Sequence, residues 1–573
     1  MKHKKVLIVL LLVIGAVYAN SLVSGFVWDD NTLIIQKQAF FSNPENAVRI
    51  LTSPDAPLGV KTPYYRPLNT LTYMVDHFIF GLHPFWYHLE NVLLHAVVVM
   101  LFYLLLLELF EDEWLAFFSA LLFAVYPVNA ESVNWISARN VILCSVFSVA
   151  SLLFLARGKK AISFLAYFLA LLSKEPAVVL PFFLLSLGLT SSGNRFKARK
   201  NVLIGFFAVT SLYFVLRHLV LGTFTGNSGL DLSLSNLKLI SSVYFENFKL
   251  FVFPFKLNSR YTEAQMYFSP IKAVSAIACV LFLLYFALKK ESPEPVRFGA
   301  QWILWGLLPI SGIIKIPSGP VAERYQYTVL FGAVLMIGYA LSRLRTKKVF
   351  AGTVIAAALT LALGARTFER NFVWKDDISF FSGMIRANPA NGEAYCDLGT
   401  VYGEMGEADK AIREFQSALA LGYPQAWVNI GIAHTHEGRL DDAVQDFKKA
   451  LVLNPKNTEA MAHLGVAYEQ EGNLEQAERE YKETLALDPG LAMTQVNLGV
   501  VYAKEGRFED AERQLKGALT LDPGLDLARM DLGIVYGKEG RFQDAIGEFQ
   551  AALKLNPGNS QARELLSKME LRM

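Results

Sequence analysis

Cysteine is scarce in this chain of 573 residues, and its three copies stand far apart at Cys144, Cys279 and Cys396. Three scattered cysteines provide no disulfide framework, and the sequence contains no Cys or His spacing typical of a metal site. Cys144 and Cys279 lie in apolar runs, where a cysteine behaves as a small hydrophobic residue. The sequence therefore excludes a small disulfide-stabilised protein.

Charged residues are also few. They make up 18% of the chain against 53% hydrophobic residues, and the net charge is +3. A composition this apolar excludes an ordinary soluble protein, and the near-neutral balance gives no argument for nucleic-acid binding. The apolar residues concentrate before about residue 366, whereas the remainder is polar and periodic. We therefore expect a membrane part followed by a soluble part.

The first apolar segment follows a basic start, Lys2–Lys5, and ends at the stretch FVWDDNTLI, residues 26–34. A basic start and a short apolar run also suit a cleaved signal peptide. The run stays apolar as far as Trp28 and many further spans follow, which favours an uncleaved anchor. The positive-inside rule then keeps the basic start in the cytoplasm and brings Asp29 and Asp30 out on the opposite face.

The apolar segments up to Ala365 predict an all-α, polytopic membrane domain with about eleven crossings. A further segment, Leu237–Phe255, is interrupted by polar and charged residues, which favours a re-entrant or surface-lying helix. An odd number of crossings places the C-terminal part on the same, non-cytoplasmic side as the two aspartates. Compact loops favour a prokaryotic protein, so we expect a multi-pass protein of the inner or plasma membrane.

A repeat array fills the C-terminal part. The pattern Leu-Gly-x-x-Tyr begins at Leu398, Leu464, Leu498 and Leu532, with a variant at Ile430, and Pro455, Pro489, Pro523 and Pro557 are spaced 34 residues apart. This is the tetratricopeptide repeat (TPR) signature of paired helices. We expect the membrane domain over 1–366, a connecting or capping helix over 367–390 and a solenoid of about five repeats over 391–573. Its concave face suits a protein or peptide, the alternative being a purely architectural array.

Polar residues cluster at the predicted outer ends of the spans, where ionisable side chains are candidates for function. The alternative for each one is a snorkelling anchor or a helix-pairing contact. The clusters supply Arg66, His83, His88, Asn91, Glu131, Arg139, Lys174, Glu175, Glu323, Arg324 and Tyr325. Arg66, Arg139, Lys174 and Arg324 are candidates for binding a lipid-linked phosphate, and Asp29 or Asp30 for a general base, with the others in support.

The stretches that carry these residues together resemble one family. They are FVWDD, YYRPLNTLTY, HPFWYHLENVLLH, YPVNAESVNWISARN, SKEP and VAERYQY. The chain is similar, over nearly its whole length, to the transmembrane and tetratricopeptide repeat-containing protein O-mannosyltransferases and their prokaryotic relatives, which have the GT-C fold. The resemblance implies an outer-facing site with an acidic catalytic base in the first loop, here Asp29 or Asp30. Tyr126 and Asn129 depart from the histidines common in relatives, which leaves the sugar open.

The resemblance also implies the reaction: transfer of one mannose-like sugar from a polyprenyl-phosphate carrier to Ser or Thr of a protein held by the repeats. Two alternatives stay open. One is a membrane-anchored assembly scaffold without catalysis, and the other is a transporter, polymerase or transferase that acts on a glycan or lipid. An Asp-Asp pair can hold Mg²⁺ or Mn²⁺, but the sequence offers no second ligand set, so a divalent cation stays optional and no metal ligands are predicted.

Overall fold

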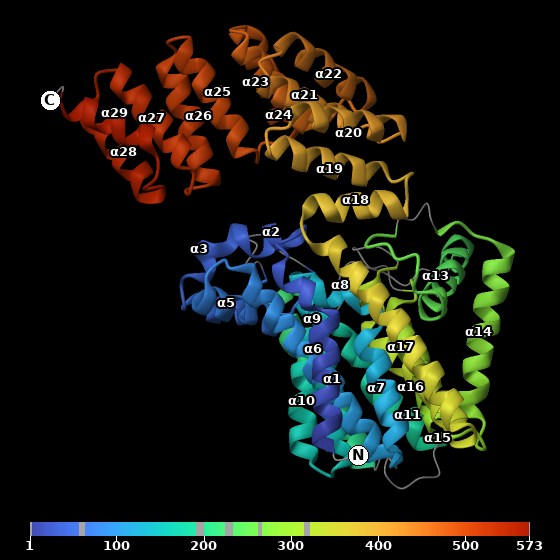
Figure 1. The fold of residues 1–573 in the computed structure, drawn as a ribbon. Helices are drawn as coiled ribbons and strands as arrows, with labels where there is room; N and C mark the ends of the chain where they lie inside the picture. The colour runs from blue at the N-terminus through green and yellow to red at the C-terminus, as the bar shows by residue number, and fades with distance from the viewer. Residues whose placement is uncertain are drawn as a thin grey trace. The chain divides into compact units, whose positions relative to one another are not determined.

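The computed structural model describes residues 3–54, 56, 63–190, 200–223, 233–261, 266–313 and 321–571. The chain divides into two compact units, Met1–Pro389 and Ala390–Met573. All regular structure in the described residues is helical (Figure 1). The all-α fold class is therefore confirmed, and each unit is taken by itself below.

Long apolar helices build the first unit. They are α1 (His3–Val17), α6 (Pro84–Phe110), α7 (Glu113–Val125), α9 (Arg139–Ala156), α10 (Lys160–Ser173), α11 (Leu180–Thr190), α12 (Lys200–Leu221), α14 (Pro270–Leu288), α15 (Glu294–Leu307), α16 (Glu323–Lys347) and α17 (Val349–Asn371). Six helical stretches among the described residues are long and apolar enough to cross a membrane: Pro84–Phe110, Ile136–Ala156, Lys200–Leu221, Pro270–Leu288, Glu323–Lys347 and Val349–Trp374. A multi-pass membrane protein is thus supported, while the number of eleven crossings stays a prediction.

Close approach of helix backbones explains part of the packing. A Cβ added to Gly299 on α15 would lie 2.7 Å from the carbonyl oxygen of Gly332 on α16. A Cβ added to Gly332 would come closer still to the carbonyl oxygen of Gly299. Small residues at such crossings are typical of helix pairs in membranes, where packing rather than the hydrophobic effect drives association.

The first predicted span ends earlier than expected. Helix α1 stops at Val17, and a short 3-10 helix, η1 (Ala19–Val23), follows it where we predicted continuation to Phe26. Helix α17 explains this change, because Asn371 donates a side-chain hydrogen bond to the carbonyl of Val17 at 2.9 Å. Asn20 in turn donates to the carbonyl of Phe368 at 2.8 Å. These bonds tie the exit of the first helix to the end of the last long one.

The other helices of this unit, most of them short, gather at the end of the apolar helices that lies opposite the chain's N-terminus (Figure 1). They are α2 (Asp29–Leu33), η2 (Ile35–Lys37), α3 (Gln38–Phe41), α4 (Asn46–Thr52), α5 (Pro67–Phe80), α8 (Asn129–Asn134), η3 (Ile136–Ala138), η4 (Glu175–Val179), α13 (Leu234–Val252), η7 (Leu308–Ile310), η8 (Phe372–Trp374) and α18 (Asp377–Ala387). Apolar side chains that include Ile34, Phe41, Tyr73 and Tyr87 form a small core beneath α2–α5. This end carries the FVWDD stretch.

Paired helices build the second unit. They are α19 (Gly392–Glu404), α20 (Ala408–Ala420), α21 (Ala426–His436), α22 (Leu440–Leu453), α23 (Thr458–Gln470), α24 (Leu474–Leu487), α25 (Ala492–Lys504), α26 (Phe508–Leu521), α27 (Asp526–Lys538), α28 (Phe542–Leu555) and a last single helix, α29 (Ser560–Glu570). In the variant repeat, where His434 replaces tyrosine, its Nδ1 lies 2.8 Å from Asp446 Oδ2 on the partner helix. The predicted boundary at 366/367 falls inside α17, and the unit boundary lies at 389/390.

Candidate functional site

Asp30 is fully buried at the start of α2 and is engaged by donors from its surroundings. Its Oδ1 accepts the backbone N–H of Ser137 at 2.8 Å and the hydroxyl of the same residue at 2.5 Å. Its Oδ2 accepts the backbone N–H of Val27 at 3.2 Å. Burial raises the pKa of Asp30 to about 7, against the lowering effect of these hydrogen bonds. Asp30 thus joins the first loop to η3.

Asp29 differs sharply from its neighbour. Its side chain is half-buried, and no hydrogen bond or ion pair joins its carboxylate to another residue within the described ranges. Burial raises the pKa of Asp29, whereas the nearby cations Arg324 and Arg260 act to lower it. A carboxylate that faces a partly open space without a fixed partner is the one of the pair able to meet an incoming hydroxyl.

Helix α16 begins with Glu323 and Arg324, and each of these residues forms a buried ion pair. Arg324 Nη1 lies 2.5 Å from Glu131 Oε1, and the backbone N–H of Arg324 donates to the other Glu131 oxygen at 3.1 Å. Arg370 on α17 pairs with Glu323 at 3.0 Å. The Arg324 guanidinium also lies 4.9 Å from the Trp135 ring and 5.0 Å from the Tyr325 ring. These contacts fix Arg324, whose charge acts on Asp29.

Lys174 also contacts Tyr325, with its Nζ 5.6 Å from the centre of that ring. It is 9% exposed, and no hydrogen bond or ion pair joins its ammonium to the residues the structure describes. Burial and the nearby Arg66 and Arg324 lower the pKa of Lys174 to about 7, while Glu175 acts in the opposite direction. A cation held this way gains most from an incoming anion.

Arg66 and Glu175 form a forked pair next to Lys174. Arg66 donates from Nε and Nη2 to Glu175 Oε2 at 3.0 and 2.8 Å, and Arg217 Nη1 lies 3.6 Å from Oε1. Arg66 also lies 4.3 Å from the Tyr64 ring. One carboxylate therefore faces two arginines, and the local charge remains positive. Tyr325 contacts both Arg324 and Lys174, and the charges of Arg324 and Arg66 act on Asp29 and Lys174, respectively.

Arg139 belongs to a separate network. Its guanidinium is fully buried, pairs with Asp76 at 2.5 Å and Glu90 at 3.1 Å, and donates from Nε to Asn91 at 2.8 Å. These partners lie on α5 and α6, so Arg139 joins α9 to both helices. The sequence grouped Arg139 with the phosphate-binding cations. Thr72 and the carbonyl of Tyr87 also accept hydrogen bonds from it, so five protein groups, two of them carboxylates, engage Arg139 where we expected a phosphate.

Of the two predicted supporting histidines, His88 contacts the first loop. His88 Nε2 lies 3.1 Å from the carbonyl of Gly25, which fixes α6 against the first loop. His83 is the residue that precedes the first turn of α6. Within the described part of the chain, no group of three or more His, Cys, Asp or Glu side chains is arranged to hold a metal ion. Asp29 and Asp30 therefore lack a third such ligand there.

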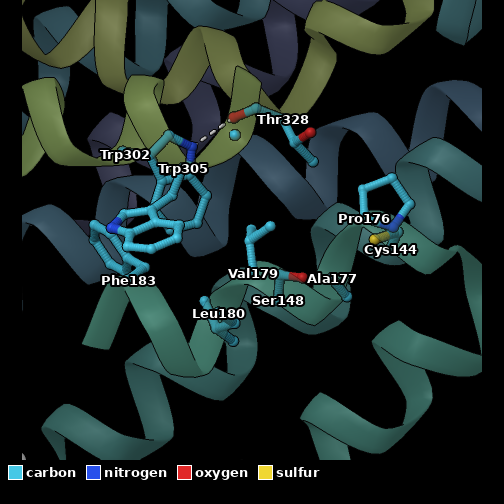
Figure 2. Close-up of a pocket in the computed structure, with 11 residues that line it drawn as sticks. Cys144, Ser148, Pro176, Ala177, Val179, Leu180, Phe183, Trp302, Trp305 and Thr328 are labelled. Atoms are coloured by element: carbon cyan, nitrogen blue, oxygen red, sulfur yellow. Dashed lines mark hydrogen bonds between the residues drawn. The ribbon is translucent and has the colours of Figure 1, made fainter. Parts of the chain in front are cut away.

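An apolar cavity lies near Lys174, between η4, α11, α9 and α15 (Figure 2). The cavity volume is about 40 Å³, and the space between its walls reaches about 480 Å³ only when the solvent onto which it opens is counted. Figure 2 shows Phe183, Trp302 and Trp305 on one side and Cys144, Pro176 and Ala177 on the other. Pro176 and Ala177 follow Lys174 in the chain by two and three residues. The cavity thus begins close to the cation.

Known proteins resemble both units. Residues 396–458, 434–495 and 502–569 match the tetratricopeptide repeat family. Over 461 residues the chain is 23% identical to human protein O-mannosyl-transferase TMTC3, which covers 71% of this chain. Over 504 residues it is 24% identical to human protein O-mannosyl-transferase TMTC1, again covering 71% of this chain. The chain is a distant homologue of the TMTC-like protein O-mannosyl-transferases. The predicted resemblance is confirmed.

This TMTC-like chain spans about half the length of the curated relatives it matches: 50% of TMTC3 and 54% of TMTC1. The Caenorhabditis elegans protein O-mannosyl-transferase F38B6.6 is 25% identical over 375 residues, which are 62% of this chain and 54% of that protein. Among solved structures, the TPR protein TTC0263 of Thermus thermophilus covers 31% of this chain with 99% of its own, at 25% identity and a TM-score of 0.29.

Sequence reasoning missed several residues of the candidate site. Asp76 and Glu90 hold Arg139, Arg217 shares Glu175 with Arg66, and Asp377 contacts the first loop. Glu90 stands within HPFWYHLENVLLH, which was singled out for other residues, and Asp76 follows the end of YYRPLNTLTY by three residues. A charged residue in an apolar neighbourhood is the signal that marks them. Nothing in the sequence marks Asp377 as a partner of residue 28.

Proposed function

We propose that this protein transfers one sugar from a polyprenyl-phosphate carrier to a Ser or Thr hydroxyl of a protein on the non-cytoplasmic side of the membrane. The observation that carries the proposal is a half-buried Asp29 that has no partner among the described residues and feels the charge of Arg324, together with Lys174, which has no ion-pair partner in the same ranges and feels the charge of the same arginine. Distant homology to protein O-mannosyl-transferases supports the reaction class and a mannose-like sugar. The orientation in the membrane rests on the predicted topology.

Asp29 acts as the general base in this proposal. The acceptor hydroxyl attacks the anomeric carbon, the new carbon–oxygen bond forms, and the bond from that carbon to the carrier phosphate breaks. The hydroxyl proton passes to Asp29, and the carrier leaves as polyprenyl phosphate. Attack opposite the leaving group inverts the anomeric carbon. The raised pKa of Asp29 makes its carboxylate a better proton acceptor than an ordinary aspartate.

Lys174 and Arg324 stabilise the phosphate as it leaves. Lys174 has no protein counter-ion among the described residues, and Arg66 keeps the surroundings positive although Glu175 neutralises part of its charge. Preorganised cations aimed at developing negative charge are a principal source of rate acceleration in buried sites. Arg139 is left out of this set because Asp76, Glu90 and Asn91 already engage it. We assign Arg139 to holding the helices that frame the site.

The apolar cavity beside Lys174 supports a lipid-linked donor over a nucleotide sugar. Aromatic and aliphatic side chains line it. One lining residue, Pro176, stands two positions after Lys174, the cation proposed to bind the phosphate. An isoprenoid chain attached to that phosphate gains hydrophobic free energy by entering such a space. We propose that the first isoprene units of the carrier occupy it.

The TPR unit holds the acceptor protein in this proposal. Five helix pairs present a repeated surface, and arrays of this kind bind extended peptides along one face. A non-catalytic scaffold remains the second candidate, since the matched family models cover the repeats, and a repeat fold alone implies no catalysis. A polymerase or lipid-directed transferase is the third, with the same phosphate site and another acceptor.

A reconstitution experiment tests the proposal. Purified protein in liposomes receives undecaprenyl-phosphate mannose or dolichyl-phosphate mannose together with Ser- and Thr-containing peptides. We expect mannosylated peptide and released polyprenyl phosphate, with and without added Mg²⁺ or Mn²⁺ in parallel. Mass spectrometry of extracytoplasmic proteins from cells with and without the chain separates the candidates. Lost protein glycosylation supports the proposal, lost polysaccharide supports a polymerase, and an unchanged glycan inventory supports a scaffold.

A further inference from the structure

The backbone just before Asp29 is strained. Trp28 has a φ angle of +57° and a ψ angle of −120°, and Trp28 and Glu111 are the two non-glycine residues with positive φ among the described residues. A bulky aromatic residue seldom adopts this conformation, and it persists only where its surroundings enforce it. The φ and ψ angles of Trp28 set the direction in which the chain enters Asp29. Whatever holds Trp28 therefore aims the proposed base.

Helix α18 holds Trp28 from a point nearly 350 residues along the chain. The backbone N–H of Trp28 donates to Asp377 Oδ1 at 2.7 Å, and Asn31 Nδ2 donates to Asp377 Oδ2 at 3.1 Å. Both oxygens of Asp377 are thereby used, one on each side of Asp29. The backbone N–H of Gly25 donates to the carbonyl of Lys375 at 2.9 Å.

Ring stacking fixes the Trp28 side chain in the same place. Its ring lies 5.4 Å from the Phe380 ring at an interplanar angle of 28°, and 4.9 Å from the Trp135 ring at 27°. Phe380 belongs to α18, the helix that carries Asp377. Trp135 also stacks with Trp374 at 6.0 Å. The first loop is therefore clamped between α18 and the segment that precedes α9.

We propose that Asp377 is a positioning residue for Asp29, which extends the proposed function and rests on it. Its carboxylate makes a charge-assisted hydrogen bond that keeps Trp28 in the strained conformation, and its second oxygen fixes Asn31. Helix α18 does not need Asp377 as a cap, because Asp376 already accepts the backbone N–H of Ser379 at 2.8 Å. The two adjacent carboxylates thus have different roles. Asp376 caps helix α18, and Asp377 binds the first loop at Trp28 and Asn31.

Hydrogen–deuterium exchange of the purified full-length protein tests this contact without any substrate. Asp377→Ala exposes the Trp28 amide, and we expect the peptide that covers residues 26–31 to exchange at least about tenfold faster. Asp377→Asn keeps an acceptor oxygen for Trp28, and Asn31 can rotate its amide to suit, so exchange stays close to that of the wild type. Asp376→Ala is the matched control, since it removes a carboxylate from the same turn. Equal exchange in wild type and Asp377→Ala overturns the proposal.

Sugar-transfer kinetics with polyprenyl-phosphate mannose test the consequence. We expect Asp377→Ala to lower kcat by about 10- to 100-fold, with little change in the KM for the donor, because misplacement of a reacting group by about 1 Å costs this much. Asp377→Glu keeps the charge but moves it by one methylene, so kcat should fall as well. Asp377→Asn should restore most of the activity. Asp376→Ala should leave kcat within about threefold of the wild type.

The outcomes separate this inference from the proposed function. An active Asp29→Asn variant removes the proposed base, whatever Asp377 does. An inactive Asp29→Asn together with fully active Asp377→Ala and Asp377→Glu overturns the positioning role alone. An equal loss in Asp376→Ala and Asp377→Ala also overturns it, because α18 would then matter only as a folded helix. If Asp377→Ala does not fold, Asp377→Glu and Asp377→Asn decide between the same results.

Discussion

Ser137 gives both its backbone N–H and its hydroxyl to one oxygen of Asp30, at 2.8 and 2.5 Å. The adjacent Asp29 has no such partner within the described residues. Two carboxylates that look equivalent in the sequence are therefore different in the fold. Asp30 ties the first loop to η3, which leaves Asp29 as the proposed base.

Replacing Asp30 should damage stability more than replacing Asp29. In Asp30→Ala, the N–H groups of Val27 and Ser137 and the Ser137 hydroxyl lose their acceptor in a buried place, which costs about 2–4 kcal/mol in all. Asp29→Ala removes no hydrogen bond. Thermal unfolding in detergent should show a clearly lower Tm for Asp30→Ala and a nearly unchanged Tm for Asp29→Ala. The opposite order would reverse the roles given to the two residues.

Activity should fall on both sides of a pH optimum. Lys174, with a pKa of about 7, loses its proton as the pH rises above that value and then attracts the donor phosphate less. Asp29 is protonated at low pH and then cannot act as a base, so activity falls. Because its pKa is raised, this fall in activity begins at a higher pH than for an ordinary aspartate. We expect kcat/KM for the donor to decline by up to about tenfold per pH unit on the alkaline side.

Lys174→Arg tests whether deprotonation of Lys174 causes the decline of activity above pH 7. A guanidinium stays protonated throughout the assay range, so the decline above pH 7 should disappear or shift upward. Lys159→Arg is the control, because Lys159 is exposed just before α10, at the end of that helix remote from Lys174. An unchanged alkaline decline in Lys174→Arg would mean that another group causes it.

The sequence predicted the residue types of the site better than their pairing. Leu-Gly-x-x-Tyr and the spaced prolines were enough for the repeats, because each unit's contacts are local and periodic. The sequence also offered Asp29 or Asp30 as the base and Arg66, Arg139, Lys174 and Arg324 as phosphate-binding cations, and these roles stay predictions. Asp377 could not be foreseen, because its contact with Trp28 depends on how the first loop and α18 meet in three dimensions. The partners of Arg139 were hidden for the same reason.

Filling the apolar cavity should weaken binding of a long carrier. Ser148 is 5% exposed and lines the cavity, so Ser148→Phe places a ring in the proposed path of the isoprenoid chain. We expect the KM for a long-chain donor to rise by about tenfold or more, as a loss of about 1.4 kcal/mol requires, with a smaller effect on a short-chain analogue. Leu185→Phe, at a residue 39% exposed on α11, is the control. Equal effects on both donors would argue against this path.

Two glycines of the TPR unit should respond oppositely to alanine. A Cβ on Gly465 would lie 2.5 Å from a ring atom of Tyr481, so Gly465→Ala should destabilise the unit by about 1–3 kcal/mol. A Cβ on Gly547 of α28 meets nothing within 4 Å, so Gly547→Ala should stabilise it by about 0.5–1 kcal/mol. Urea unfolding followed by circular dichroism on residues 390–573 measures both. A stabilising Gly465→Ala would contradict the helix pairing.

The most direct test of the central claim compares the wild type with Asp29→Asn in one sugar-transfer assay. Liposomes with purified protein, a polyprenyl-phosphate mannose donor and a Ser/Thr peptide acceptor are sampled over time, and mass spectrometry counts the mannosylated peptide. We expect mannosylation by the wild type and a rate about 100-fold or more lower in Asp29→Asn, with an unchanged Tm. A wild-type rate in Asp29→Asn would show that Asp29 is not the base.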